Sequence, residues 1–151
     1  MRRLLILVGV FATVAFVSSA TASTTYHGTF TGGTGTYENG VSVALTGSGN
    51  WNLNIGSNGV QLTGMVFVTH APCNQAESFP PCQFNLPLTA VAWGSGSWTG
   101  NVFVMPGTLQ LGQVHFDVTF AMAGDSVTLT FEISGCPYYW KTWIFTGIAD
   151  M

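Results

Sequence analysis

The sequence predicts an all-β fold, built as a single antiparallel meander of about eight strands. Two observations lead to this prediction. Apolar and polar residues alternate with a period of two in segment after segment beyond residue 22, and the helical period is absent there. Turn-forming residues, above all glycine, separate these segments at short intervals. At 151 residues, the chain has room for one ordinary domain.

The alternation is clearest in the second half of the chain. In the segment 113–120 every second residue is apolar, and the residues between them are polar. The segment 126–134 repeats this pattern, and both segments are rich in the β-branched and aromatic residues that a pleated surface favours. Each is therefore predicted to be a strand with one buried face. The same reading predicts strands at 26–37, 41–55, 60–70, 83–93, 98–105, 109–122, 126–134 and 138–147.

The turns set the boundaries of these strands. The first strand, 26–37, ends before Asn39 and Gly40, and its own glycines are expected to act as bends. The second, 41–55, is either one long bent strand or two strands joined at 47–49, because its apolar residues keep one parity throughout. Only the connection 71–82 is longer than a few residues. Further turns are expected at 56–59, 106–107, 123–125 and 135–137.

Short connections make sequential strands antiparallel neighbours. With eight strands, the first and the last also run antiparallel and are able to pair. A closed up-and-down β-barrel is therefore favoured over a two-sheet β-sandwich, because closure removes the exposed edges that such uncharged strands could not otherwise defend.

Residues 1–22 read as a secretory signal peptide. Arg2 and Arg3 form a positive start, an uncharged and mostly apolar run of 14 residues follows, and small residues lead up to Ala22. Such a run spans about 21 Å as a helix, less than the roughly 30 Å hydrocarbon core. Cleavage after Ala22, or alternatively after Ala20, leaves a single domain at 23–151. We expect a secreted protein, extracellular, periplasmic or at the cell surface, without membrane attachment after cleavage.

Export permits disulfide bonds, and residues 23–151 contain Cys73, Cys82 and Cys136. The favoured pair is Cys73 with Cys82, because these two bracket a proline-containing loop of 10 residues. Closing that loop would stabilise the fold by roughly 2.5–3 kcal/mol. The other two pairings stay open, and Cys136 is then either a buried thiol or an intermolecular link. The cysteines lack the paired spacing of structural zinc sites, so no metal is expected.

The charge balance argues against nucleic acid as a partner. Beyond residue 22, Lys141 is the one lysine or arginine against six carboxylates, which gives a net charge of −5 with neutral histidines. A basic patch cannot be assembled from a single lysine. Only 6% of the residues are charged, so the surface is expected to be polar through Gly, Thr, Ser and Asn.

The sequence contains no nucleophile motif and no phosphate-binding loop. The best acid–base candidate is His115 with Asp117, which share one strand face at i and i+2. A polar surface pair is the preferred interpretation, because no partner motif accompanies them. Metal binding by His27, His70 and His115 would require three separate strands to converge. We therefore expect no enzyme activity, no catalytic residue and no cofactor.

Tryptophan is the residue type most suggestive of function. Trp93 shares parity with polar neighbours, which predicts a place on the wetter face. Trp140 and Trp143 have opposite parity in one strand, so an aromatic residue is expected outside whichever face is buried. The candidate ligand-binding residues are Trp93, Trp98, Trp140 and Trp143. Flat rings stack on sugar faces, and nearby Asn, Gln and Thr can hydrogen-bond hydroxyls. The alternative is that the rings cap the barrel ends or its seam.

These observations favour a secreted, non-catalytic domain that binds a glycan or a small apolar ligand through exposed aromatics. A second hypothesis is self-association, as a structural subunit of a cell-surface layer or filament. In that case the stretch 24–37, whose weak alternation leaves its register easy to exchange, would pair with a neighbouring molecule's sheet. A small outer-membrane barrel is the third hypothesis, because alternation does not say which face is outside.

Overall fold

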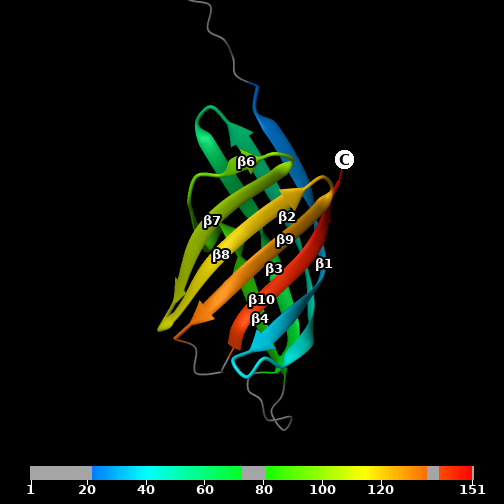
Figure 1. Cartoon of the computed structure of the whole chain (residues 1–151), viewed down its shortest axis with the longest axis vertical. Helices are drawn as coiled ribbons and strands as arrows, with labels where there is room; N and C mark the ends of the chain where they lie inside the picture. The colour runs from blue at the N-terminus through cyan, green and yellow to red at the C-terminus, as the bar shows by residue number, and fades with distance from the viewer. Residues whose placement is uncertain (1–21, 73–80, 136–139, 151) are drawn as a thin grey trace, which may run out of the picture.

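A computed structural model describes residues 22–72, 81–135 and 140–150. They form one antiparallel sheet of ten strands in the order β4-β3-β2-β1-β10-β9-β8-β7-β5, with β6 paired to β7. The sheet curls into a half-barrel, with β7 to β10 in front of β2 to β4 (Figure 1). A short 3-10 helix, η1 (Leu88–Ala90), joins β4 to β5. The strands are β1 (Thr24–Tyr37), β2 (Ser42–Gly56), β3 (Gly59–Pro72), β4 (Pro81–Pro87), β5 (Ala92–Trp93), β6 (Ser97–Thr99), β7 (Val102–Leu111), β8 (Val114–Ala123), β9 (Ser126–Ser134) and β10 (Trp140–Ala149).

The predicted all-β antiparallel meander is confirmed. The first and last strands pair as expected, with Gly28 opposite Ala149 and Thr36 opposite Thr142. The number of strands is higher than the predicted eight, and the hydrogen-bonded ladder does not close into a barrel. All ten strands nevertheless belong to one sheet rather than to the two sheets of a sandwich.

The ladder is open in the middle of the chain, where the predicted strand 83–93 divides. β4 pairs with β3 as far as Pro87, which has no N–H group to donate. The chain then turns through η1, and β5 pairs with β7 instead. The three-residue strand β6 pairs with the start of β7. The chain therefore crosses from one side of the opening to the other without a continuous ladder.

Two other boundaries are decided by the structure. The predicted stretch 41–55 forms one long strand, β2, from residue 42 onward, which is one of the two alternatives that the sequence left open. The turn predicted at 106–107 is wrong, because Pro106 lies inside β7 and the chain reverses after Leu111, where Gly112 has a φ of +59°. The Pro106 carbonyl accepts a hydrogen bond from the Gly94 N–H, on the β5 side. The missing N–H of Pro106 faces that same side, so the pairing of β7 with β8 is not interrupted.

Inward-facing side chains from every long strand fill one apolar core. The alternation predicted for 113–120 and 126–134 is confirmed, since the apolar residues of β8 and β9 face inward and the polar ones outward. No polar or charged residue is buried among the described residues. The largest fully buried side chains are Trp51, Trp140, Phe103, Phe120, Phe131 and Phe145.

Candidate functional site

Trp140 and Trp143 are both buried, which corrects the expectation that one of them lies outside. Their exposed fractions are 2% and 3%. The cause is a β-bulge at Lys141: Thr36 and Tyr37 are consecutive on β1, yet they pair with Thr142 and Trp140 on β10. The extra residue shifts the alternation by one, so both tryptophans face the core.

Inside the core, these two tryptophans pack against other rings. The ring of Tyr37 stacks on that of Trp140 with centroids 4.1 Å apart and an interplanar angle of 20°. Trp140 and Trp143 meet edge to face at 5.9 Å. Neither indole offers a face to a ligand in solution, so any platform must come from the other tryptophans.

Trp93 is half-buried and has a structural role. Its Nε1–H donates to the Leu88 carbonyl at 3.0 Å, which ties the strand β5 to η1. Trp93 also lies opposite Gly107 in the ladder, and a Cβ at Gly107 would lie 2.6 Å from the indole ring. The ring therefore covers the glycine. The prediction that Trp93 lies on the wetter face assumed regular alternation along 83–93, and η1 interrupts that alternation.

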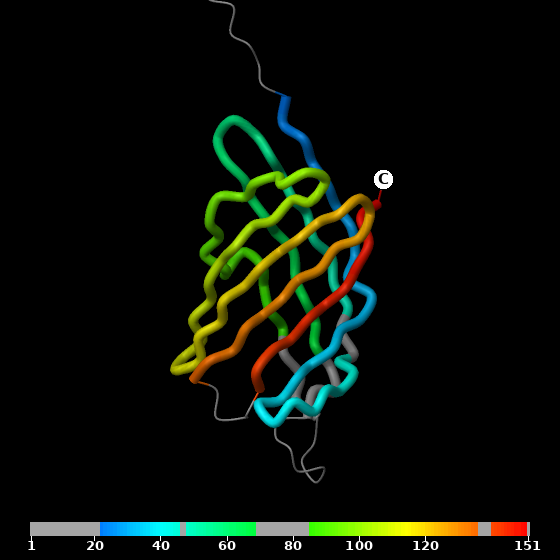
Figure 2. The backbone as a smooth tube through the Cα atoms, viewed as in Figure 1, coloured from blue at the N-terminus to red at the C-terminus, as the bar shows by residue number. Residues whose placement is uncertain are grey.

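Trp98 is the candidate tryptophan that keeps a large exposed surface. It is 49% exposed although it pairs with the buried Phe103 across β6 and β7. The Phe103 ring meets the indole at 5.4 Å, and the Tyr26 ring lies 6.4 Å away at 60°. Both β6 and the start of β1 lie at the upper end of the molecule (Figure 2). An aromatic pair, Trp98 with Tyr26, thus stands at the rim of the half-barrel.

Tyr26 did not emerge from the sequence as a site residue. It lies on a glycine- and threonine-rich strand with little alternation, and its partner Trp98 is 72 positions further along the chain. Only the curl of the sheet brings the start of β1 toward β6.

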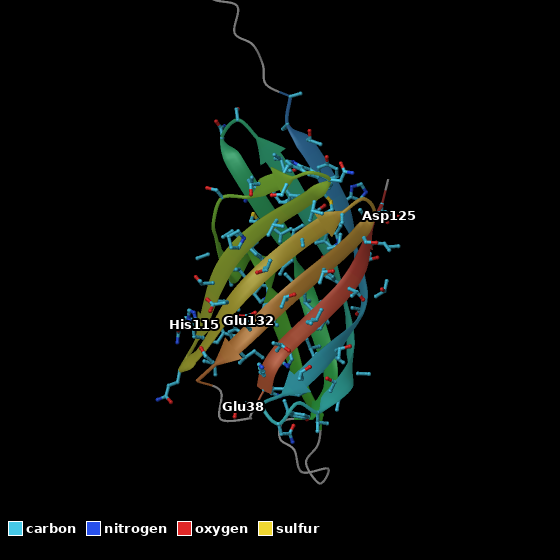
Figure 3. The ribbon with its side chains drawn as sticks, viewed as in Figure 1. Glu38, His115, Asp125 and Glu132 are labelled. Atoms are coloured by element: carbon cyan, nitrogen blue, oxygen red, sulfur yellow. The ribbon has the colours of Figure 1, made fainter. Side chains whose placement is uncertain are left out.

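A second group of side chains lies on the outer face near the opposite end. Asp117 is opposite Glu132 on β8 and β9, and Glu132 is opposite Thr142 on β10. His115 and Glu132 lie on the same part of the outer face, whereas Asp125 lies at the other end (Figure 3). A surface depression of about 290 Å³ follows this group and is lined by Asp117, Glu132, Ile133, Ser134, Lys141 and Thr142.

The predicted pair of His115 and Asp117 is in contact. The His115 Nε2 lies 3.1 Å from the Asp117 Oδ1, and its Nδ1 lies 3.2 Å from the Gln110 Oε1. The orientation of the Gln110 amide follows from its own Nε2–H, which donates to the Gly112 carbonyl at 2.8 Å. Both partner atoms are acceptor oxygens, and a neutral imidazole has one N–H, so the ring can donate to only one of them at a time.

Within the described part of the chain, histidines, cysteines and carboxylates form no group of three or more that could hold a metal ion. His27 is at the end of the sheet opposite His115, where its Nε2 lies 4.0 Å from the Asp150 Oδ2. Cys82 belongs to β4, opposite Ala71. Cys73 and Cys136 lie outside the described residues, as do residues 1–21 of the predicted signal segment 1–22, so the disulfide and the cleavage site stay predictions.

Comparison of the chain with family models, curated proteins and solved structures finds no match. The residues described above also contain no helix of the length and apolar character that crossing a bilayer requires.

Proposed function

We propose that this protein is a secreted, non-catalytic β-domain that binds a glycan through the aromatic rim of Trp98 and Tyr26. One observation carries the proposal: an indole with about half of its surface in solvent is held by a buried ring on one side and faces a second aromatic ring. Leaving a large apolar ring in water forgoes roughly 1.5–3 kcal/mol of burial. A sugar face stacked on the indole would recover part of that free energy.

A glycan fits this arrangement better than a small apolar ligand. The interior, where an apolar ligand would gain most from burial, is filled by large side chains such as Phe103 and Trp51. The segment around Trp98 is instead polar and uncharged, with Ser95, Ser97 and Thr99 exposed. Hydroxyl groups of this kind exchange hydrogen bonds with sugar hydroxyls at small desolvation cost.

The surroundings of the His115 imidazole favour a binding role over a catalytic one. A general base needs a nitrogen within reach of the substrate proton. Here each ring nitrogen lies within 3.2 Å of a side-chain oxygen, of Gln110 or of Asp117. We assign this trio to the surface structure of the β7–β8 hairpin.

Two observations favour this proposal over strand exchange and over an outer-membrane barrel. β1 is hydrogen-bonded on both sides, to β2 and to β10, so an exchange of 24–37 between molecules would have to break two ladders. A lipid-embedded barrel places apolar side chains outside and polar ones in its lumen. The described residues have the reverse distribution, with an apolar core and a threonine-rich outer face.

The experiment is calorimetric titration of the protein with a panel of soluble polysaccharides and oligosaccharides. Trp98→Ala is expected to weaken binding about tenfold or more, the effect of losing about 1.4 kcal/mol of stacking. Trp98→Phe keeps a flat ring and is expected to retain most of the affinity.

Phe67→Ala is the matched control, because Phe67 is 43% exposed on β3 and is not part of the rim. It should leave the affinity unchanged. Absence of heat with every carbohydrate, or equal losses for Trp98→Ala and Phe67→Ala, would contradict the proposal.

A further inference from the structure

One edge of the sheet lacks a neighbouring strand. β3 pairs with β2 from Gly59 onward, but it pairs with β4 only from Met65. The segment Gly59–Gly64, here called the β3 edge, therefore has a ladder on one side only. Antiparallel pairing uses the backbone groups of alternate residues on each side. Alternate residues of the β3 edge thus direct N–H and C=O groups away from the sheet, and no backbone hydrogen bond to another described residue satisfies them there.

The local sequence explains where this edge begins. Gly64 has a φ of +142°, in the region that L-residues rarely adopt, and a Cβ at this position would overlap the Asn50 carbonyl oxygen. The strand therefore changes its backbone conformation at Gly64. Pairing with β4 starts at the next residue, Met65, and the residues before Gly64 are left without a partner on that side.

Three of the strands along the opening, β4, β5 and β6, carry protection against edge-to-edge pairing. β4 starts with Pro81 and ends with Pro87. β5 has two residues and β6 has three. Proline and short length are two of the devices by which proteins guard a sheet edge. The β3 edge has neither, and no lysine, arginine, aspartate or glutamate occurs anywhere in 42–64.

We propose that the β3 edge pairs with the β3 edge of a second copy of this chain, forming a two-fold symmetric dimer with a continuous sheet. An antiparallel pair of identical strands is self-complementary, so one unguarded edge per molecule is sufficient. Gln61 faces outward and Thr63 is half-exposed, and both are uncharged, so two molecules of net negative charge meet here without like charges opposite each other. Leu62 stays in the core of its own molecule.

The second copy is a better occupant than an unrelated strand, because the edge has no charged side chain that would select a partner. Gln61 and Thr63 are both uncharged. Main-chain hydrogen bonds would supply most of the affinity. The same edge of a second molecule provides the matching backbone donors and acceptors. Since the edge is consumed by the pairing, association ends at two molecules and does not continue into a filament.

The test is sedimentation equilibrium of the exported, purified protein from about 10 μM to about 1 mM, a range that covers weak edge-to-edge association. The wild-type protein is expected to form dimers and no larger species. The double variant Gln61→Lys/Thr63→Lys places like charges against each other across the two-fold axis. It is expected to raise the dimer dissociation constant by about tenfold or more.

The matched control is Thr119→Lys/Thr146→Lys, which adds the same charges to exposed positions on β8 and β10, strands that are paired on both sides. It should dimerise as the wild type does. A wild-type protein that is monomeric throughout the range, or a control that loses the dimer as the edge variant does, would overturn the proposal.

Amide hydrogen exchange on the wild-type protein is a second test, and it does not require that any variant folds. Alternate amides of the β3 edge are expected to exchange more slowly at the high concentration than at the low one. A dimer in which these amides exchange equally fast at both concentrations would use another surface, and the β3 edge would be excluded.

Discussion

The glycines of β1 differ in what surrounds them, although the sequence suggests one common role as bends. Gly28 is buried, and a Cβ there would overlap the Ile148 carbonyl oxygen of β10 and lie 2.7 Å from the Trp51 ring. Gly32 lies at a register shift between β1 and β10, and nothing lies within 4 Å of the position of its Cβ. Gly28 is therefore required by a close approach of β1 to its neighbours, whereas Gly32 is not.

Gly28→Ala is expected to destabilise the protein by about 2–3 kcal/mol, because backbone on one side and an indole on the other must move to admit a methyl group. Gly32→Ala should change the free energy of unfolding by less than about 0.5 kcal/mol. Urea unfolding of both variants at constant m-value measures the difference. Equal losses for the two would show that the packing around Gly28 is not the cause.

Strand β10 shows how one additional residue decides which side chains enter the core. Lys141 is the bulged residue, since its neighbours Trp140 and Thr142 pair with consecutive residues of β1. From Trp143 onward the alternation is regular, with Ile144 outside and Phe145 inside. The bulge is therefore confined to one position, and the rest of the strand obeys the period of two.

Deletion of Lys141 is expected to be tolerated, at a cost of about 1 kcal/mol, because it makes the ladder continuous and leaves Trp140 facing inward. Deletion of Ile144, which is also exposed, would instead turn Trp143 outward and Thr142 inward. That variant should fail to fold. Near-ultraviolet circular dichroism and tryptophan emission distinguish the outcomes, and a folded Ile144 deletion would contradict this account of the strand.

The aromatic cluster of the core affects the pH dependence of folding. Burial raises the pKa of Tyr37 above its ordinary value of about 10. The folded state thus holds the phenolic proton more tightly than the unfolded state does. The associated stability is present at neutral pH and is lost as the pH rises above the unfolded pKa.

Unfolding by denaturant is therefore expected to become easier above about pH 10, and Tyr37→Phe should reduce that dependence because no ionisable group then remains at the position. Absorbance titration of tyrosinate should also show one tyrosine that ionises later in the folded protein than in denaturant. A stability curve of Tyr37→Phe that falls as steeply with pH as the wild-type curve would assign the effect to another group.

Much of the fold could be predicted because its main signal is local. The inward and outward faces of β8 and β9, the hairpin turns near Gly40 and Gly124, and the pairing of the first strand with the last follow from alternation and short connections. The candidate site could be predicted only in part. Trp98 is exposed as a platform requires, but Trp140 and Trp143 are buried and Trp93 is half-buried.

The features that could not be predicted depend on where the regular pattern is interrupted. A bulge at Lys141, a turn at η1 and the conformation of Gly64 each alter the face or partner of the residues beside them. Pro87 and Gly64 mark two of these places in the sequence, but a proline or a glycine does not specify which strand pairs next. Alternating residues alone were enough to specify an antiparallel sheet with an apolar side, because a strand's pleat has a period of two wherever it occurs. The curl of the complete sheet decided the open ladder, the unguarded β3 edge and the contact of Tyr26 with Trp98. This curl is the sum of small local shifts over all ten strands.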